Sequence, residues 1–216
     1  MFVEAAVESL DAAVAAERAG AQRIELCARL DLGGTTPTLT LVEKVLEKAK
    51  IPVHVMIRPR GGDFVYTDHE LISITKDAVR VCRLQPAGLV TGAIGADRQL
   101  RRSDVSRLLD AAGDLSITFH RAFDALADQQ TALEELIDLG VKRILTAGGA
   151  SSALAGVERI AGLVKQARER ITIIAGGGVR AHNVGEVIRR SEVREVHARY
   201  VDDDQMRSLV GAARTL

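Results

Sequence analysis

Residues 51–64 of this 216-residue chain, IPVHVMIRPRGGDF, join a strand-like run to a turn that holds two arginines and two glycines. Read at the period-two spacing of a strand, His54, Met56 and Arg58 share one face, which brings an imidazole and a guanidinium to the same side of a sheet. The proline after Arg58 ends the strand because it has no N–H to donate, and Arg60 follows it. The two arginines predict an anion-binding turn; in the alternative interpretation they pair with carboxylates and only fix the loop.

A second group of chemically active residues lies in the segment TFHRAFD. His120 is a candidate general acid or base, because the ordinary pKa of histidine lies near neutral pH; a hydrogen-bonded structural histidine is the alternative. Asp124, a further candidate catalytic residue, follows within about one turn. Arg121 has the opposite parity to His120 and is expected to pair with Asp124. Glu25, in the earlier segment RIELC, is a further candidate for proton transfer.

Short strand-like runs and longer helical runs alternate along the chain and must position these residues. Eight runs are predicted as strands, at residues 2–7, 23–27, 53–58, 88–92, 116–120, 143–146, 172–175 and 195–197. Helices are predicted between them, at residues 10–19, 39–50, 68–84, 103–112, 128–139, 156–169 and 184–190. This alternation predicts an α/β fold, a TIM-type (β/α)8 barrel. A doubly wound open sheet is the alternative, but no GxGxxG follows the first strand.

Side chains on barrel strands alternate between the interior and the surrounding helices. One face is polar on most strands, and its members are Glu4, Glu25, Cys27, His54, Arg58, Thr118, His120, Glu195 and His197. Packing alone does not need so many titratable groups, because each buried charge requires a partner. Several of them lie near the carboxyl ends of their strands, where TIM-barrel active sites form, which favours a functional site over an internal ion-pair network. Glu4 is deeper and is expected to be structural.

Glycine-rich loops follow the sixth and seventh predicted strands, in TAGGA and AGGGV. Such loops expose backbone N–H groups near a helix start, which is how TIM barrels often hold phosphate; a plain tight turn is the alternative. A third loop, with glycines 33 and 34, could close over a ligand. The predicted ligand-binding residues are His54, Arg58, Arg60, Gly148, Gly149, Gly176, Gly177 and His197.

Composition limits the possible partners. Lysines plus arginines equal aspartates plus glutamates, 29 each, so no overall field attracts nucleic acid or an anionic membrane. The two cysteines form no CxxC pattern, and the N-terminus resembles no standard export signal, so we expect a reducing cytoplasm. The length suits one domain over residues 1–216.

The motifs VHVMIRPRGGDF, RIELC, TFHRAFD, RILTAGG and GGGV, in this order, resemble the CutC family of copper homeostasis proteins. The resemblance covers nearly the whole chain. It implies a TIM-type barrel, a cytosolic location, a homo-oligomer such as a dimer, and a role in copper handling.

Departures from the family pattern concern the metal. The family carries a cysteine on each of the first two strands, whereas this chain has Ala6 at the first position and Cys27 at the second. Cys27 is therefore the one predicted metal ligand, and a lone thiolate needs help from His54, Met56 or another soft ligand to hold Cu(I). As an alternative, Cys27 is a small buried apolar residue. The segment after His197 is also short for the family, which predicts an open rim.

Two functions follow, and the sequence leaves both open. The resemblance implies copper binding or trafficking that requires Cys27. The polar rim instead suits an isomerase- or lyase-like enzyme acting on a small anionic or phosphorylated metabolite, in which Arg58 and Arg60 bind the anion while Glu25 and His120 transfer protons. A catalytically silent scaffold is a third possibility, although it leaves the polar rim unexplained.

Overall fold

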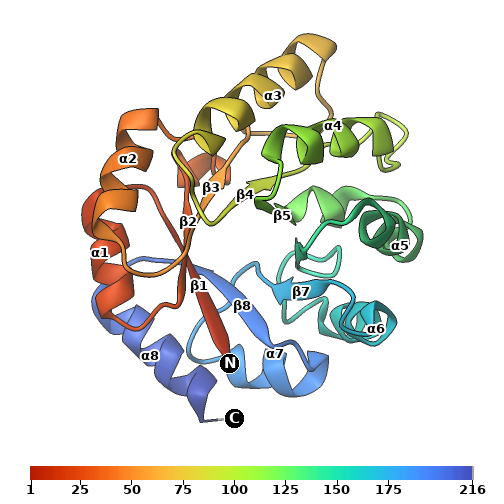
Figure 1. Cartoon of the computed structure of the whole chain (residues 1–216). Helices are drawn as coiled ribbons and strands as arrows, with labels where there is room; N and C mark the ends of the chain where they lie inside the picture. The colour runs from red at the N-terminus through yellow and green to blue at the C-terminus, as the bar shows by residue number, and fades with distance from the viewer. Residues whose placement is uncertain (216) are drawn as a thin grey trace.

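The computed structural model describes residues 1–215 and forms a closed barrel of eight parallel strands in sequence order (Figure 1). The barrel closes because β1 (Phe2–Val7) pairs with both β2 (Arg23–Leu26) and β8 (Glu195–Arg199). Between β2 and β8 come β3 (Val53–Met56), β4 (Gly88–Thr91), β5 (Ser116–Phe119), β6 (Arg143–Thr146) and β7 (Thr172–Ala175). The predicted TIM-type barrel is confirmed, and the closure excludes an open doubly wound sheet.

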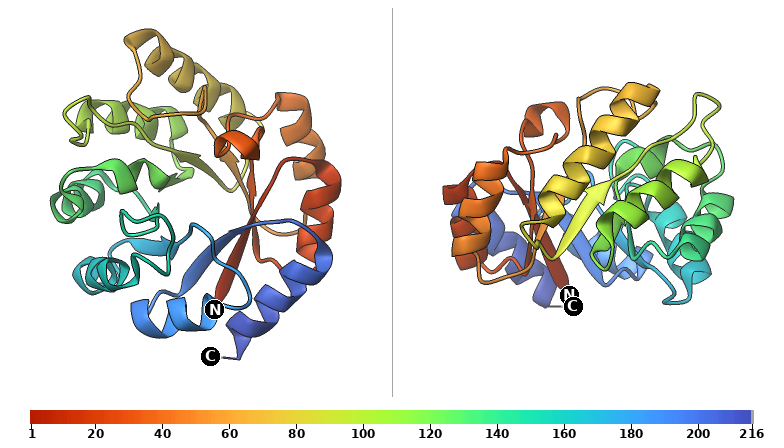
Figure 2. Two further views of the ribbon diagram at one scale, coloured as in Figure 1. Left: turned by 180° about the vertical axis from the view of Figure 1, so that it is seen from behind. Right: turned by 45° about the horizontal axis from the view of Figure 1, so that its top comes forward.

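Helices surround the strands on the outside, as the two further views in Figure 2 also show. They are α1 (Leu10–Arg18), α2 (Leu39–Lys48), α3 (Asp68–Cys82), α4 (Arg102–Ala112), α5 (Gln129–Leu139), α6 (Val157–Ala167), α7 (Val184–Ser191) and α8 (Asp203–Arg214). Two short 3-10 turns, η1 (Leu30–Leu32) and η2 (Arg121–Ala125), follow β2 and β5. Within residues 1–215, no helix has both the length and the apolar character needed to cross a membrane.

Local chemistry sets where the helices begin and end. A capping box opens α3, because Thr67 and Glu70 each accept the other's backbone N–H with a side-chain oxygen. Gly20 and Gly140 follow α1 and α5 with φ of +100° and +89°, the predicted left-handed stops. The predicted bounds of β1, β6 and β7 match the observed ones, and the other five strands end one or two residues from their predicted ends. The one extension is at β8, which continues to Arg199.

The two faces of the strands have opposite character. Outward side chains such as Ile24, Leu26 and Val55 are fully buried against the helices. Inward side chains such as Glu4 and His54 are polar and equally buried, so the barrel interior is a packed polar layer. The predicted alternation of polar and apolar side chains along the strands therefore matches the inner and outer faces of the barrel.

Ion pairs close the amino-terminal end of the barrel. Arg23, the first residue of β2, donates to Glu4 and to Oε2 of Glu195, the latter at 2.6 Å. Its guanidinium carbon also lies 4.8 Å from the centre of the Phe2 ring. Arg143 of β6 donates to the hydroxyl of Ser116 on β5. This network fills the amino-terminal end, so the polar residues at the carboxyl ends of the strands face the other opening.

Candidate functional site

A cavity of about 230 Å³ lies at the carboxyl ends of the strands, where the sequence predicts the site. Glu25, His120 and His197 line it, and Met56 and Phe64 contribute apolar surface. Its cationic wall consists of four arginines, Arg58, Arg121, Arg180 and Arg199. The cavity thus gathers predicted residues from β2 and β8 and from the turns that follow β3 and β5.

His197 links the cavity to the buried charges below it. Its Nδ1 lies 2.8 Å from Oε1 of Glu4, and its Nε2 lies 3.6 Å from Oε2 of Glu25. Burial raises the pKa of Glu4, but the hydrogen bond with His197 and the charge of Arg23 outweigh burial and hold that pKa below its ordinary value. Burial lowers the pKa of His197, and the charges of Glu25 and Glu4 outweigh it and raise the pKa. Glu4 is therefore an ionised structural group, as expected.

Glu4, Glu25 and His197 also bring one possible metal-binding atom each to within 4.8 Å of one another. Carboxylate oxygens are hard ligands and do not match the preference of Cu(I) for sulfur. The guanidinium of Arg23 donates to Glu4 and opposes a cation at this point. We interpret these three side chains as an internal ion-pair network.

The thiol of Cys27 is fully buried beside Glu25. Its Sγ donates to Oε2 of Glu25 at 3.4 Å. Burial, followed by the charge of Glu25, raises the pKa of the Cys27 thiol well above its ordinary value. Burial also raises the pKa of Glu25, and among residues 1–215 its second oxygen, Oε1, has no hydrogen-bond partner. A neutral thiol therefore lies against a carboxyl group that can receive its proton.

Cys27 shares a small buried cluster with Met56 and Val90, separate from the main core. A Cβ placed on Gly34 would lie 3.1 Å from the Cys27 sulfur and 3.4 Å from the terminal methyl group of Met56. The thiol and the thioether side chain thus approach the same point beneath the loop that follows β2. Both are soft ligands of the kind that Cu(I) prefers. Ala6, where the resemblance implies the other cysteine, lines the neighbouring cavity.

His54 lies deeper in the barrel, and burial lowers its pKa to about 4. Among the described residues its Nδ1 has no hydrogen-bond partner. A Cβ on Gly88, the facing residue of β4, would lie 2.9 Å from Nε2 of His54, so the glycine makes room for the imidazole. His54 is thus neutral near pH 7 and is one layer below the cavity residues.

His120 is also neutral, because burial, followed by the charge of Arg58, lowers its pKa to about 3. Its Nδ1 accepts the backbone N–H of Ala122 at 3.2 Å, so the ring proton lies on Nε2. Its ring packs 4.9 Å from the ring of Phe64. With its lone pair occupied, His120 is better suited to donate a hydrogen bond than to accept a proton. Its predicted catalytic role stays a prediction.

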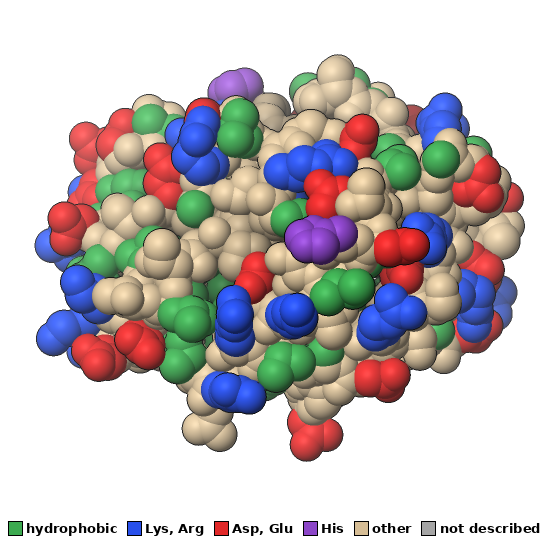
Figure 3. All heavy atoms as spheres, turned by 90° about the horizontal axis from the view of Figure 1, so that it is seen from above, with side chains coloured by type: hydrophobic (Ala, Val, Ile, Leu, Met, Phe, Trp, Pro, Cys, Tyr) green, Lys and Arg blue, Asp and Glu red, His purple; other side chains and the backbone are tan. Residues whose placement is uncertain are grey.

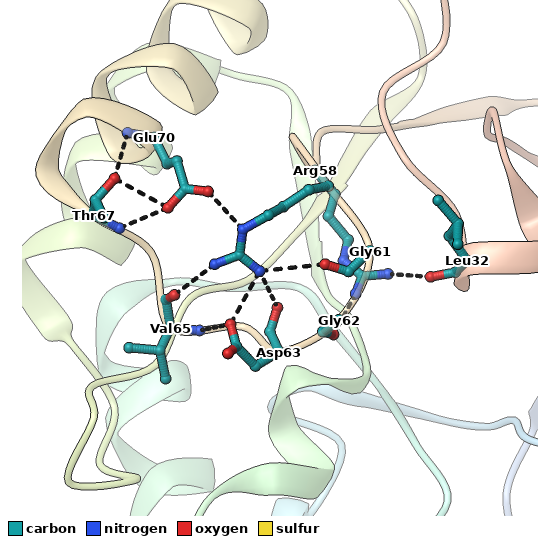
Figure 4. Close-up of polar contacts among 9 residues, drawn as sticks. Leu32, Arg58, Gly61, Gly62, Asp63, Val65, Thr67 and Glu70 are labelled. Carbon is teal, nitrogen blue, oxygen red and sulfur yellow. Dashed lines mark hydrogen bonds and ion pairs between the residues drawn. The ribbon is translucent and has the colours of Figure 1, made fainter.

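Arg58 fixes two loops to each other (Figure 4). Its Nη1 donates to the carbonyl oxygens of residues 32–34 at 3.1 to 3.2 Å, and its Nη2 donates to that of Gly62 at 2.8 Å. The guanidinium carbon lies 4.6 Å from the centre of the Phe64 ring. Arg58 therefore fixes the loop through backbone carbonyl oxygens, not through the carboxylates of the alternative interpretation, and it also lines the cavity.

Arg60 points to the other side of the same turn and contacts α3 (Figure 4). Its Nε donates to Glu70 at 2.6 Å, its Nη1 to Asp63 at 3.0 Å and its Nη2 to the carbonyl oxygen of Val65 at 2.9 Å. These contacts use the donors that anion binding would need. The sequence predicts that both arginines bind one anion, but in the structure Arg58 lines the cavity whereas Arg60 contacts α3.

Asp124 holds the loop after β6. It accepts the N–H groups of Ala147 and Gly149, each at 3.0 Å, and the hydroxyl of Thr146. Its other oxygen accepts Nε of Arg121 at 2.8 Å, the predicted pair. With Gly148 and Gly149 it lines a separate surface hollow, so these three predicted residues lie apart from the cavity. In the loop after β7, Gly176 donates its N–H to the carbonyl oxygen of Thr146 at 2.9 Å, whereas Gly177 and Gly178 line the cavity.

Sequence reasoning missed two arginines of the cavity, Arg180 and Arg199. Arg199 has the same parity as Glu195 and His197, so extending the last predicted strand by two residues would have found it. Arg180 follows directly after the segment AGGGV, but that position alone does not predict where its side chain goes.

Comparisons with known proteins identify the family of this chain. The family model of the CutC family matches residues 1–201. The human copper homeostasis protein cutC homolog is 44% identical over 209 residues, covering 95% of this chain and 76% of the relative. A CutC family protein of Mesorhizobium japonicum is 43% identical over 196 residues, covering 91% of this chain and 76% of the relative.

Solved structures show the same relationship. CutC from Streptococcus agalactiae superposes with a TM-score of 0.86 at 34% identity, covering 91% of this chain and 97% of the other. The phosphoribosylanthranilate isomerase of Pyrococcus furiosus, with a TM-score of 0.63 at 16% identity over the full length of both chains, shares the fold alone. Both the motifs and the matched length lead to one conclusion: this chain belongs to the CutC family.

Proposed function

We propose that the chain is a cytosolic copper-handling protein that binds Cu(I) through the sulfur atoms of Cys27 and Met56. Membership of a family whose human relative is named a copper homeostasis protein supports this proposal. The observation that carries it is the approach of the Cys27 thiol and the Met56 side chain to one point under Gly34. Cu(I) prefers thiolate and thioether ligands, so Met56 supplies the second soft ligand in a chain that has Ala6 in place of a cysteine.

Proton transfer accompanies the binding of copper in this proposal. A thiol must lose its proton to ligate a metal, and burial makes that loss unfavourable for Cys27 without a nearby acceptor. Oε2 of Glu25 already accepts the hydrogen bond of the thiol. Glu25 is therefore the group that receives the proton, and the copper–thiolate bond replaces the S–H bond.

Access to the site runs through the cavity. Met56 and Gly33 line the cavity, while the loop of residues 30–34 covers Cys27. Arg58 holds this loop by its three carbonyl contacts, so the loop must loosen slightly for copper to reach the thiol. The expected homo-oligomer is part of the same proposal and is tested by sedimentation of the purified protein.

The test is an anaerobic competition titration in which a chromophoric chelator holds Cu(I) and the protein is added. The native chain and Cys82→Ser should remove one copper ion per chain from the chelator, because Cys82 lies on α3, outside the barrel interior. Cys27→Ser should remove far less. A native chain that leaves the chelator fully loaded, or a Cys27→Ser variant that competes as well as the native chain, would refute copper binding at Cys27.

A further inference from the structure

Two arginines of the cavity, Arg180 and Arg199, have no acidic partner among residues 1–215. Arg180 uses its Nη1 to donate to the carbonyl oxygen of Val179 at 2.7 Å. Arg199 is exposed, and within residues 1–215 its side chain forms neither a hydrogen bond nor an ion pair. On the face drawn in Figure 3, in contrast, basic and acidic side chains lie interspersed. The two guanidinium groups thus form a local cationic site in a chain of zero net charge.

The loop after β7 adds hydrogen-bond donors to this cationic site. Gly177 and Gly178 line the cavity with φ of +101° and +71°, and their N–H groups donate no hydrogen bond within the described chain. The guanidinium of Arg121 lies 3.4 Å from where a Cβ on Gly177 would be, and its Nε is occupied by Asp124. Its Nη groups remain available. This side of the cavity therefore presents N–H groups and positive charge.

The buried part of the cavity has two further donors without a partner. Nε2 of His120 carries the ring proton, because Nδ1 accepts the N–H of Ala122, and Nε2 has no partner in residues 1–215. Nε of Arg58 is likewise without a partner in the described chain. His120 is 3% exposed and Arg58 is 4% exposed. Leaving a buried donor unpaired is unfavourable, so both positions favour a ligand that brings oxygen acceptors.

One buried oxygen in the cavity wall needs a hydrogen-bond donor. Oε1 of Glu25 is buried in the same cavity wall and accepts no hydrogen bond from residues 1–215. A hydroxyl group can both donate to this oxygen and fit beside the apolar surface of Met56. The ligand therefore needs an oxyanion for the arginines and a hydroxyl group for Glu25.

We propose that this cavity binds a small phosphate monoester with a hydroxyl group, whose phosphate contacts Arg180, Arg199 and the Gly177–Gly178 loop. The double negative charge of a phosphate ester matches two arginines without carboxylate partners. The cavity of about 230 Å³ is smaller than the roughly 300–1,000 Å³ of common ligand pockets, which limits the ligand to a few carbon atoms. This site shares Glu25 and Met56 with the proposed copper site, but its phosphate contacts do not involve Cys27.

The test is isothermal titration calorimetry of the metal-free protein with glycerol 3-phosphate at low salt. We expect one site per chain and a weakening of about tenfold or more in Arg199→Ala and in Arg180→Ala, because each loses a charged hydrogen bond. The matched control is Arg194→Ala. Arg194 precedes β8 at the opposite end of the barrel and pairs with Glu169 with a side chain that is 81% exposed. This control should bind as the native chain does.

Two comparison ligands separate the parts of the proposal. Glycerol should not bind, since it lacks the phosphate, and inorganic phosphate should bind more weakly than glycerol 3-phosphate, since it lacks the hydroxyl for Glu25. No binding of glycerol 3-phosphate, or equal binding by the native chain and both arginine variants, would overturn the site. Equal affinity for inorganic phosphate and glycerol 3-phosphate would overturn the role of Glu25. Because the protein is metal-free, these outcomes do not depend on copper binding.

Discussion

Sγ of Cys27 donates a hydrogen bond to Oε2 of Glu25 across 3.4 Å, inside a barrel where both side chains are almost fully buried. A cysteine that only fills space needs no carboxyl group beside it, and burying a carboxyl group without a full set of partners is unfavourable. Under the proposed function, this contact joins a metal ligand to an acceptor for its proton. This arrangement leads to the first prediction, which concerns the second sulfur atom.

Met56→Leu should weaken Cu(I) binding by tenfold or more, because leucine keeps the volume but removes the thioether. Such a volume-conserving change in a core usually costs less than about 1.5 kcal/mol of stability, so the fold should persist. The measurement is chelator competition under anaerobic conditions. Met206→Leu is the matched control, since Met206 is equally buried but lies on α8. Equal affinities of native protein and Met56→Leu would exclude the thioether as a ligand.

Arg58→Ala should release the loop of residues 30–34. The variant loses four hydrogen bonds to carbonyl oxygens, and we expect a loss of stability of about 2–4 kcal/mol. Hydrogen exchange followed by mass spectrometry should show faster exchange in residues 28–37. Arg60→Ala is the control, because Arg60 contacts residues 61–70 and should leave that loop protected. Unchanged exchange in Arg58→Ala would contradict the loop-fixing role.

Arg23→Met should destabilise the barrel by about 3–5 kcal/mol, because it leaves the buried charge of Glu4 without its guanidinium partner. Urea unfolding gives the free-energy difference directly. Arg18→Ala removes an exposed arginine that pairs with Asp203 at 3.5 Å and should change stability by less than about 1 kcal/mol. If both variants lose the same small amount, the internal network does not stabilise the fold.

His54 should make the fold sensitive to mild acid. Its pKa of about 4 lies below the ordinary 6.5, so the unfolded chain binds its proton first and the free energy of unfolding falls as the pH drops through 6.5. Between pH 7.5 and pH 5 this group alone removes roughly 2 kcal/mol. His197 and Glu25 have raised pKa values and act in the opposite direction, so the useful quantity is a difference between variants.

The comparison is urea unfolding of native protein and His54→Gln at both pH values. The variant should lose less stability on acidification than the native chain, by roughly 2 kcal/mol. Since the other groups titrate in both proteins, their contributions cancel. Parallel losses in the two proteins would show that His54 titrates normally in the fold.

Periodicity was sufficient to predict the barrel, because parallel strands with one apolar and one polar face leave few other arrangements. The same parity predicted the inward positions of Glu25, His54 and His197, and the structure has them there: His197 contacts Glu4 and Glu25, and His54 is buried below the cavity. Parity alone could not predict hydrogen bonds. The loops fold back on themselves, so their polar groups bind one another. Arg60 donates to Glu70 and Asp63. Asp124 accepts hydrogen bonds from Thr146 and its neighbours.

The sequence also could not predict which loop residues lie close to one another. Gly149 donates its N–H to Asp124, whereas Gly177 lines the cavity, although both glycines follow a strand in similar segments. Arg180 joins the cavity from a loop whose conformation depends on two glycines with positive φ. Met56 lies beside Cys27, as the sequence suggested, but the approach of Gly34 to both side chains could not be predicted.

X-ray absorption at the copper edge of the Cu(I)-loaded protein tests the central claim most directly, because it reports the atoms bound to the metal. The account predicts two sulfur neighbours in native protein and in Cys82→Ser, and one sulfur neighbour in Met56→Leu. A spectrum with only nitrogen or oxygen neighbours, or one in which Cys27→Ser keeps the native sulfur signal, would contradict Cu(I) binding between Cys27 and Met56.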